Sequence, residues 1–293
     1  MGGTKISIAG VDAAGRFLAR TRFGTRESNS PQATIVRIIE AIRAIEGETA
    51  QPIQAIGIGC TGPVDPLTGV IGAVDLLPGW QGTPLVEILA EAFHVPAAIE
   101  NDADAGALGE WQLWRDDRFL FVSVGTGIGA GLILNGTISR GVDGSHPELG
   151  HHTIDASGPP CYCGARGCWE SLASGTAMAR HFGEGATPAE EIFARARRGD
   201  AEARQAVERQ AYYLGLGVAN LMTILCPGRI VLGGGVLESA DLLMDGIQTV
   251  IQNQCGLVPT HRMDVAVSKL GSDAVLAGAA RLAVNAWQQQ EAS

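Results

Sequence analysis

Four residues near the middle of the chain have the side chains and the spacing of a metal site. His151 is followed by Cys161, Cys163 and Cys168. One histidine and three cysteines make the ligand set of a closed, tetrahedral structural zinc site. Because four protein ligands leave no position for a metal-bound water, the pattern predicts a zinc ion with an architectural task. The alternatives are a loop of free thiols and a histidine ligand at His152 in place of His151.

Two glutamates flank this cluster. Glu148 lies three residues before His151, and Glu170 lies two residues after Cys168. A zinc-bound loop would hold the two carboxylates near each other, and carboxylates accept hydrogen bonds from sugar hydroxyls. The pair therefore indicates a sugar site, with two solvated surface charges as the alternative.

An acidic group follows a short strand-like run in the first half of the chain. Glu100-Asn101-Asp102 comes directly after the apolar residues 97–99, and ligands of α/β proteins bind at the carboxyl ends of such strands. The Asp102 carboxylate has the chemistry to take a proton from a sugar hydroxyl while that hydroxyl attacks a phosphoryl group. On spacing alone, helix capping by Asn101 or Asp102 is the favoured alternative.

Glycine clusters occur at three places, Gly2-Gly3-Thr4, Gly125-Thr126-Gly127-Ile128-Gly129 and Gly233-Gly234-Gly235. Backbone N–H groups bind phosphate where no side chain obstructs them, and a nearby hydroxyl helps. Any one cluster is more simply explained as a tight turn, but the three together indicate a nucleotide. None of them matches the P-loop pattern.

The elements that must position these residues are alternating strands and helices. Strand-like runs lie at 5–9, 53–59, 97–99, 119–124, 230–232 and 265–267, and helical patterns lie at 31–46, 84–93, 102–114, 201–225 and 273–287. A capping box at Thr187, Pro188 and Glu190 predicts one further helix start. The alternation predicts an α/β protein with largely parallel sheets. Without a low-complexity linker, the domain boundary is expected between packed elements near 110–118.

Composition narrows the class of protein. The 293 residues suffice for two domains, and 46% of them are apolar. A net charge of −10 argues against a nucleic acid partner. The sequence shows neither an apolar run long enough to span a membrane nor a secretory signal, so we expect a cytoplasmic protein.

The glycine clusters, the acidic group and the zinc pattern together resemble the ROK family, which comprises sugar kinases and sugar-responsive repressors. The matching segments, in order along essentially the whole chain, are Gly2-Gly3-Thr4-Lys5, Thr61-Gly62-Pro63-Val64-Asp65, Leu77-Pro78-Gly79-Trp80, Glu100-Asn101-Asp102, Gly125-Thr126-Gly127-Ile128-Gly129, Glu148-Leu149-Gly150-His151, Cys161-x-Cys163-Gly164-x-x-Gly167-Cys168-x-Glu170 and Leu232-Gly233-Gly234-Gly235-Val236. The zinc segment is the most specific of them. The resemblance implies an α/β, actin-like (ribonuclease H-like) fold of two domains with a cleft between them. The domains are expected at 1–115, completed by the C-terminal helix at about 280–293, and at 116–279, which carries the zinc loop.

The resemblance also implies roles for individual residues. Asp102 is expected to be the general base that activates the sugar 6-hydroxyl. The sugar-binding set is expected to be Gly62, Asn101, Asp102, Glu148, His151 and Glu170, with His151 serving both zinc and sugar. The nucleotide-binding set is expected to be Gly3, Thr4, Lys5, Thr126, Gly127, Gly234 and Gly235, with magnesium accompanying ATP. The family further implies a homodimer.

Two departures from the family pattern affect these expectations. Family members have a strand ending in aspartate directly before Gly-Gly-Thr, whereas this sequence begins inside that loop. We expect a misassigned or truncated start, and the alternative is a protein that lacks part of its phosphate site. A strand missing from the sheet would leave the flanks of its neighbours open. Ser145-His146-Pro147 resembles the family's fructokinases, whereas Leu77-Pro78-Gly79-Trp80 resembles its glucokinases.

The leading hypothesis is ATP-dependent phosphorylation of a hexose at its 6-hydroxyl, with glucose as the favoured substrate. Fructose and N-acetylhexosamines are the alternative substrates, and polyphosphate is an alternative donor. A sugar-responsive repressor would need a DNA-binding helix-turn-helix segment, for which we find no room before the kinase-like part. A non-catalytic sugar-binding or regulatory protein is the remaining alternative.

Overall fold

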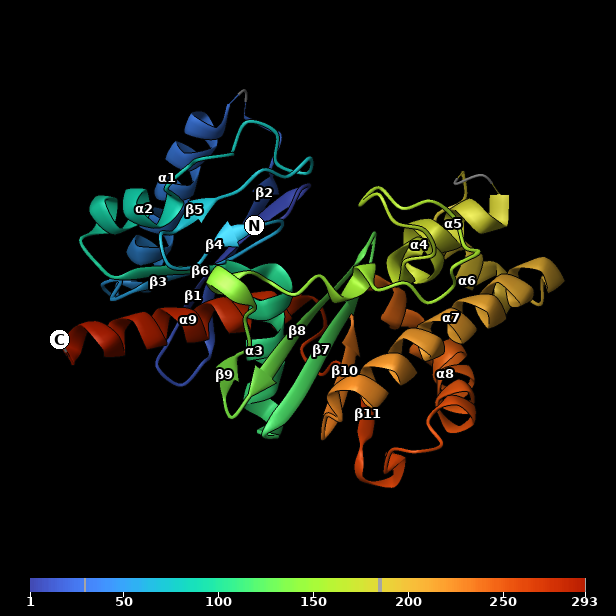
Figure 1. Cartoon of the computed structure of the whole chain (residues 1–293). Helices are drawn as coiled ribbons and strands as arrows, with labels where there is room; N and C mark the ends of the chain where they lie inside the picture. Colours follow the sequence, from blue (N-terminus) through green and yellow to red (C-terminus); the bar gives the residue numbers. More distant parts are fainter. Residues whose placement is uncertain (29, 184–185, 293) are drawn as a thin grey trace. The chain divides into compact units, whose positions relative to one another are not determined.

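The computed structural model describes residues 1–28, 30–183 and 186–292, and the chain divides into two compact units (Figure 1). Unit 1 comprises Met1–Leu113, Ile138–His146 and Asp273–Ser293, and unit 2 comprises Trp114–Thr137 and Pro147–Ser272. The expected domain bounds stay a prediction, and the units differ from them in placing Ile138–His146 in unit 1. Ser293, the end of the expected segment at about 280–293, lies outside the described residues.

Unit 1 combines strand pairs with helices. Its elements are β1 (Lys5–Val11), β2 (Phe17–Gly24), α1 (Pro31–Thr49), β3 (Ile56–Cys60), β4 (Val64–Asp65), β5 (Val70–Ile71), α2 (Leu85–Phe93), β6 (Ala97–Asn101), α3 (Asp102–Trp114, whose last residue belongs to unit 2), a 3₁₀ helix at Val142–Gly144 and α9 (Ala274–Glu291). Helix α1 forms as its sequence predicts. Ser30 caps it by accepting from Ala33 N at 3.2 Å, and its buried face presents Ile35, Ile38, Ile42 and Ile45 to the unit's core.

The strands of unit 1 bring two chain segments to one edge. β1 pairs antiparallel with β2, and β3 pairs parallel with β6 in a register that sets Cys60 opposite Asn101. Because parallel strands end at the same edge, the residues that follow β3 and β6 lie together there. Met1 also reaches this edge, where its amine donates to Gly59 O and its carbonyl accepts from Thr61 N at 2.8 Å.

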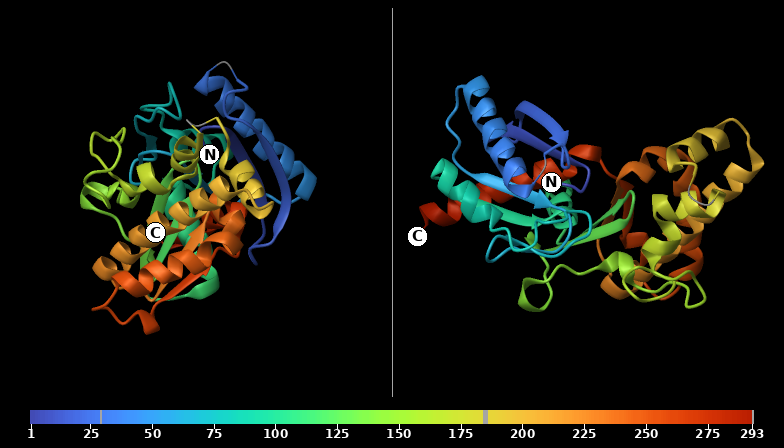
Figure 2. Two further views of the ribbon diagram at one scale, coloured as in Figure 1. Left: turned by 90° about the vertical axis from the view of Figure 1, so that its right-hand side faces the viewer. Right: turned by 90° about the horizontal axis from the view of Figure 1, so that it is seen from above.

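Helix α9 packs against β3 and α3 so closely that several of the described contacts require glycine, of which two follow (Figures 1 and 2). A Cβ on Gly57 of β3 would lie 1.8 Å from the carbonyl oxygen of Ala279. A Cβ on Gly278 of α9 would lie 1.6 Å from the carbonyl oxygen of Ala105. In each contact the new Cβ would meet backbone atoms, so no flexible side chain could move aside to make room.

Substituting Gly57 by alanine is therefore expected to destabilise the protein by about 1–3 kcal/mol or more, because β3 and α9 must move apart. Gly47 in α1 is a matched control, since a Cβ there meets nothing within 4 Å. Gly47→Ala is expected to stabilise the helix by about 0.5–1 kcal/mol. Urea unfolding of both variants tests the contact, and a Gly57→Ala variant as stable as the parent protein would contradict it.

Unit 2 is built on one mixed sheet. Its elements are β7 (Arg118–Val124), β8 (Ile128–Leu134), β9 (Thr137–Ile138, at the border with unit 1), α4 (Trp169–Ala173), α5 (Gly175–Gly183), α6 (Ala189–Arg197), α7 (Ala201–Leu225), β10 (Arg229–Gly233), α8 (Ala240–Gln254), β11 (Asp264–Val267) and 3₁₀ helices at Leu149–His151, Gly235–Ser239 and Thr260–Arg262; Gly271–Asp273 forms another at the border. Among the described residues the sheet has the order β11-β10-β7-β8-β9. β10 pairs parallel with β7 and β11, whereas β7 and β8 form an antiparallel hairpin.

Helix α7 supports the rest of unit 2. It packs along α8 (Figures 1 and 2) and also contacts α4, α5 and α6. The fully buried ring of Trp169, at the start of α4, lies against α7 and donates from Nε1 to Tyr213 O at 2.9 Å. A Cβ on Gly217 would lie 2.0 Å from this ring. The indole therefore sits directly on the bare backbone of α7.

The predicted elements correspond to observed ones with small differences in extent. α3 and α7 have the predicted bounds, whereas the run at 53–59 begins its strand only at Ile56. The predicted capping box is wrong, since the N-cap of α6 is Pro188 and no side chain makes a capping bond there. In the described ranges, no helix combines the length and apolar character needed to cross a membrane.

Candidate functional site

Asn101 fixes the end of β6 in unit 1. Its side-chain oxygen accepts from Ala103 N at 2.8 Å and so caps α3, while its Nδ2 donates to Gly62 O at 3.2 Å. Gly62 has a φ of +85°, and a Cβ there would lie 2.7 Å from Val74. The capping interpretation is confirmed for Asn101, and the same amide also holds the carbonyl of Gly62.

Asp102 opens helix α3 and is only partly exposed. Burial of its carboxyl raises its pKa, while the amine of Met1, the N–H of Ala103, the charge of His146 and the hydroxyl of Thr61 act in the opposite direction. A carboxylate with a raised pKa binds a proton more tightly than an ordinary aspartate. Asp102 is thus suited to general base chemistry.

The four predicted metal ligands come together in unit 2. The ligand atoms of His151, Cys161, Cys163 and Cys168 all lie within 4.8 Å of one another. Cys161 Sγ lies 3.4 Å from His151 Nδ1, and Cys163 Sγ lies 3.6 Å from Cys168 Sγ. In a tetrahedral site with Zn–S bonds of about 2.3 Å, neighbouring sulfurs lie roughly 3.8 Å apart. The donor set and its spacing therefore fit a zinc ion.

The thiols of this cluster influence one another's ionisation, and hydrogen bonds, first that from Ala165 N–H, lower the pKa of Cys163. Burial and the neighbouring sulfurs of Cys163 and Cys161 raise the pKa of Cys168 to about 12. A thiol in such a cluster ionises when a divalent cation compensates its charge. All three cysteines are free of disulfides, so each remains available as a ligand.

The two nitrogens of His151 face different partners. Nδ1 points to Cys161 and is the nitrogen nearest the predicted metal ligands, whereas Nε2 lies 2.9 Å from the hydroxyl of Tyr162 and 4.0 Å from Glu170 Oε1. Local desolvation of the hydroxyl, followed by the charge of Glu170, raises the pKa of Tyr162, although the residue as a whole is exposed. No sequence pattern pointed to Tyr162, which stands between two cysteines and contacts both His151 and Glu170.

Glu170 connects the cysteine loop to a glycine cluster. Its Oε2 accepts from Ile128 N at 2.8 Å, across 42 positions of sequence. A Cβ on Gly127 would lie 2.3 Å from this same oxygen. Glycine at 127 thus lets the carboxylate reach the backbone at the start of β8, and Glu170 is not the freely solvated charge of the alternative interpretation.

Glu148 lies beside the same strand without being buried. Its carbonyl accepts from His151 N at 3.0 Å in the 3₁₀ helix Leu149–His151, and its side chain is exposed. A Cβ on Gly150 would lie 2.0 Å from Ile128 O. The close approach at Gly150 holds this turn against β8 and leaves the Glu148 carboxylate accessible to a ligand.

The central glycine cluster is the tip of the β7–β8 hairpin. Val124 pairs with Ile128, and Gly125 N donates to Gly127 O at 2.9 Å. Thr126 at the tip is exposed. The tight-turn interpretation is therefore correct for this cluster, and the same turn presents the hydroxyl of Thr126 and the unobstructed Gly125.

The second cluster of unit 2 follows β10. Gly234 has a φ of +87°, and a Cβ there would lie 2.4 Å from Val124 O. Gly234 therefore tolerates no side chain for two independent reasons. A Cβ on Gly235, by contrast, meets nothing within 4 Å, so the backbone at Gly235 is open to a ligand.

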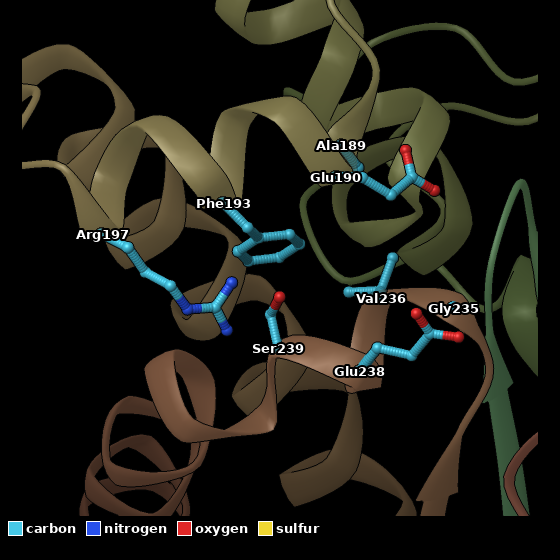
Figure 3. Close-up of a pocket in the computed structure, with 8 residues that line it drawn as sticks. All are labelled: Ala189, Glu190, Phe193, Arg197, Gly235, Val236, Glu238 and Ser239. Atoms are coloured by element: carbon cyan, nitrogen blue, oxygen red, sulfur yellow. The ribbon is translucent and has the colours of Figure 1, made fainter.

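A cavity of about 210 Å³ lies beside Gly235, between α6 and the 3₁₀ helix Gly235–Ser239 (Figure 3). Figure 3 shows the ring of Phe193 facing this space, with Arg197 on one side and Glu190 and Glu238 near the other. Arg197 is also paired with Asp241 at 2.7 Å. An aromatic ring, open glycine backbone and acceptor groups are the features that accept a flat polar ring such as a nucleobase.

The third cluster lies in unit 1. Gly2 O accepts from the hydroxyl of Thr25 at 2.6 Å, and Thr4 O accepts from Thr25 N at 3.0 Å. The side chains of Thr4 and Lys5 are exposed. Thr25 thus holds the turn in place, and the polar side chains of Thr4 and Lys5 remain accessible to a ligand.

The predicted site residues fall into one group in each unit. Unit 1 holds Gly3, Thr4, Lys5, Gly62, Asn101 and Asp102, and unit 2 holds Thr126, Gly127, Glu148, His151, Cys161, Cys163, Cys168, Glu170, Gly234 and Gly235. Within unit 1 the structure joins Gly62 to Asn101. Within unit 2 it joins Glu170 to the hairpin turn and to the metal-ligand cluster.

Comparison with known proteins shows similarity over nearly the whole chain. A glucokinase of Halalkalibacterium halodurans is 32% identical over 95% of this chain and 91% of its own length. The crystal structure of a ROK hexokinase from Thermus thermophilus superposes with a TM-score of 0.84 at 34% identity, covering 99% of this chain and 97% of the other. That of a ROK family glucokinase from Streptomyces griseus, in complex with glucose and AMPPNP, has a TM-score of 0.80 at 29% identity and covers 97% of both chains.

These likenesses, with the α/β architecture, confirm the actin-like sugar kinase fold and support a sugar kinase. The chain belongs to the ROK family, whose sequence model matches residues 1–286. A xylose repressor of Bacillus subtilis is also 31% identical, over 88% of this chain and 69% of its own length.

Proposed function

We propose that the protein phosphorylates a hexose, with glucose as the favoured substrate, at the 6-hydroxyl and with ATP as the donor. The observation that carries this proposal is the position of Asp102. Its carboxyl stands at the start of α3, directly after the parallel strand β6, and burial gives it the raised pKa of a general base. The similarity to a glucokinase solved with glucose and AMPPNP supports the same substrates.

Asp102 would accept the proton of the sugar 6-hydroxyl as that oxygen attacks the phosphoryl group. Two sets of residues are proposed to bind sugar hydroxyls, namely Asn101 and Gly62, which belong to unit 1, and Glu148, His151 and Glu170, which belong to unit 2. Carboxylates accept from hydroxyl donors, and His151 Nε2 carries a hydrogen to donate when Nδ1 is bound to metal.

The nucleotide would be bound by the three glycine clusters. Gly3, Thr4, Lys5, Thr126 and Gly127 would supply backbone N–H groups, hydroxyls and an ammonium for the phosphates. Gly235 lines the cavity proposed for the adenosine, and Gly234 directly precedes it. Bound ATP supplies the phosphoryl group, and its magnesium neutralises charge as the group is transferred.

Zinc would be held by His151, Cys161, Cys163 and Cys168, whose spacing fits it. With four protein ligands the ion would stabilise the loop structure and would not take part in the reaction. It would fix the ring of His151 and, through the loop, the carboxylate of Glu170. A homodimer and a cytoplasmic location remain expectations from the family resemblance and the composition.

The substrate is tested with a coupled ADP-release assay over glucose, mannose, fructose, N-acetylmannosamine and N-acetylglucosamine. We expect kcat/KM to be largest for glucose. Fructose as the best substrate would agree instead with Ser145-His146-Pro147, and a parallel assay with polyphosphate decides the donor. Sugar binding without sugar phosphate formation from any of the five sugars would contradict the kinase proposal.

A non-catalytic sugar-binding or regulatory protein is the second candidate, because a xylose repressor is among the relatives. It predicts sugar affinity by calorimetry but neither ADP nor sugar phosphate as a product. The same assay therefore separates the two candidates.

A further inference from the structure

A buried acid–imidazole pair lies beside the proposed base in unit 1. His146 Nδ1 and Asp104 Oδ2 are 2.7 Å apart, with the side chains 10% and 2% exposed. The second oxygen of Asp104, Oδ1, is buried and has no hydrogen-bond partner among the residues that the structure describes. Burying a carboxylate is costly unless a cation compensates it. His146 is the group placed to provide that compensation, because a carboxylate at this distance favours the protonated ring.

The two aspartates of this region share the first turn of α3. Asp102 and Asp104 both belong to it, whereas His146 comes from the segment Ile138–His146. The positive charge of His146 acts on Asp102 and favours the ionised form of its carboxyl. The imidazole of His146 thus interacts with two carboxylates: it is paired directly with Asp104, and its charge favours the ionised form of Asp102.

Asp102 needs such a charge because of where it stands. Burial favours its neutral form, which cannot accept a proton. The amine of Met1 and the hydroxyl of Thr61 also favour the ionised form of Asp102. Burial, and to a smaller extent the charge of Asp102, raise the pKa of the nearby Cys60 thiol. His146 is the side-chain cation among these groups.

Two other cations of unit 1 are engaged in ion pairs. Arg140, from the same segment as His146, forms an ion pair with the buried Glu100 before α3. Asp273, which precedes α9, is paired with Arg20 at 2.8 Å. Because Arg140 is paired with Glu100, we expect His146 to be the cation by which the segment Ile138–His146 acts on Asp102.

We propose that Asp104 and His146 are positioning residues for Asp102: Asp104 holds His146 as an imidazolium, and the imidazolium keeps the base ionised. The inference rests on the proposed role of Asp102 as the base. During the reaction the proton of the sugar hydroxyl passes to Asp102, and His146 keeps its own proton throughout. A purely structural pair would stabilise unit 1 without changing the protonation of Asp102.

The test is the pH dependence of kcat/KM in the full-length protein. Removing the cation in His146→Gln is expected to raise the pKa of Asp102, so the acid limb of the profile moves to higher pH by roughly one unit. Asp104→Asn keeps an acceptor for Nδ1 but removes the charge, and it is expected to move the limb in the same direction. Their double variant is expected to show no larger shift than His146→Gln alone. Activity on the alkaline plateau is expected to change less than activity at pH 5.

A second readout does not depend on turnover. The carboxyl of Asp102 is titrated by ¹³C NMR in protein labelled at aspartate, with Asp102→Asn to assign the signal. The midpoint is expected to rise in both His146→Gln and Asp104→Asn. His261→Gln, an exposed histidine of unit 2, is the matched control and is expected to leave the profile and the midpoint unchanged.

The outcomes separate this inference from the proposed function. If Asp102→Asn retains full turnover, the base role itself is wrong. If Asp102→Asn is inactive but folded Asp104→Asn or His146→Gln keeps the parent midpoint, the base stands and the positioning role is overturned. If His146→Gln does not fold, Asp104→Asn decides the matter by the same two measurements.

Discussion

Asp102→Asn is expected to lower kcat by about 10²–10⁴-fold while leaving the affinity for glucose nearly unchanged. The asparagine keeps an oxygen that accepts from a sugar hydroxyl, but it does not take up the proton. The loss should therefore appear in kcat and not in the dissociation constant. Steady-state kinetics and calorimetry with glucose measure the two quantities separately.

The same substitution has a predictable effect on stability. Burial raises the pKa of Asp102, so the folded protein holds this proton more tightly than the unfolded chain. The contribution of Asp102 to the free energy of unfolding is thus fully present below the ordinary pKa of an aspartate. It is lost as pH rises through the raised pKa of the folded protein. At neutral pH the ionised carboxyl is a cost, and Asp102→Asn should be at least as stable as the parent protein.

The melting temperature at pH 7 provides the control for the kinetic result. An inactive variant that melts at or above the parent temperature shows that chemistry and not folding was lost. Asp65→Asn is a useful comparison, because that exposed carboxyl has a lowered pKa from its bonds to Thr68 and Leu67 and lies outside the proposed base machinery. Unchanged turnover in Asp102→Asn would refute the base role.

Loss of the metal is the second large effect. Cys163→Ser is expected to lower zinc content, the melting temperature and the affinity for glucose. Without the fourth ligand the ring of His151 loses its fixed orientation, and one charge-assisted hydrogen bond to the sugar is worth about 1.5–3 kcal/mol. That corresponds to roughly a 10–100-fold weaker glucose affinity.

Cys226→Ser is the matched control for this experiment. Cys226 is an exposed, free cysteine of unit 2 at the end of α7, outside the metal-ligand cluster. Zinc is counted by mass spectrometry, melting is followed by circular dichroism, and glucose binding is measured by calorimetry. A Cys163→Ser protein that keeps its glucose affinity would show that the metal does not orient the sugar site.

The parts that could be predicted from the sequence are those whose cause is local. Helix α7 has the predicted bounds because one apolar face repeats along 25 residues between the cap at Asp200 and the left-handed Cys226. The four predicted metal ligands come together in the structure, and their residue types and spacing sufficed to single out this set. Asn101 was recognised as a cap because capping depends on the next two residues.

The parts that could not be predicted depend on contacts between distant segments. Glu170 meets Ile128, and His146 meets Asp104, each across 42 positions. No periodicity of either segment encodes such a pairing. The capping box failed for a different reason, since Pro188 already provides an extended residue before α6, and the helix begins without the bond from Thr187.

The contact between Trp169 and Gly217 has a consequence for how this sequence can change over time. The indole occupies the volume that any side chain at 217 would need, and it is fully buried and hydrogen-bonded to α7. Neither position is then free to vary alone: a larger residue at 217 demands a smaller one at 169. Because Trp169 follows Cys168 directly, sequence change in α7 is restrained by a residue next to the predicted metal-binding loop. Relatives that differ at one of the two positions should therefore differ at both.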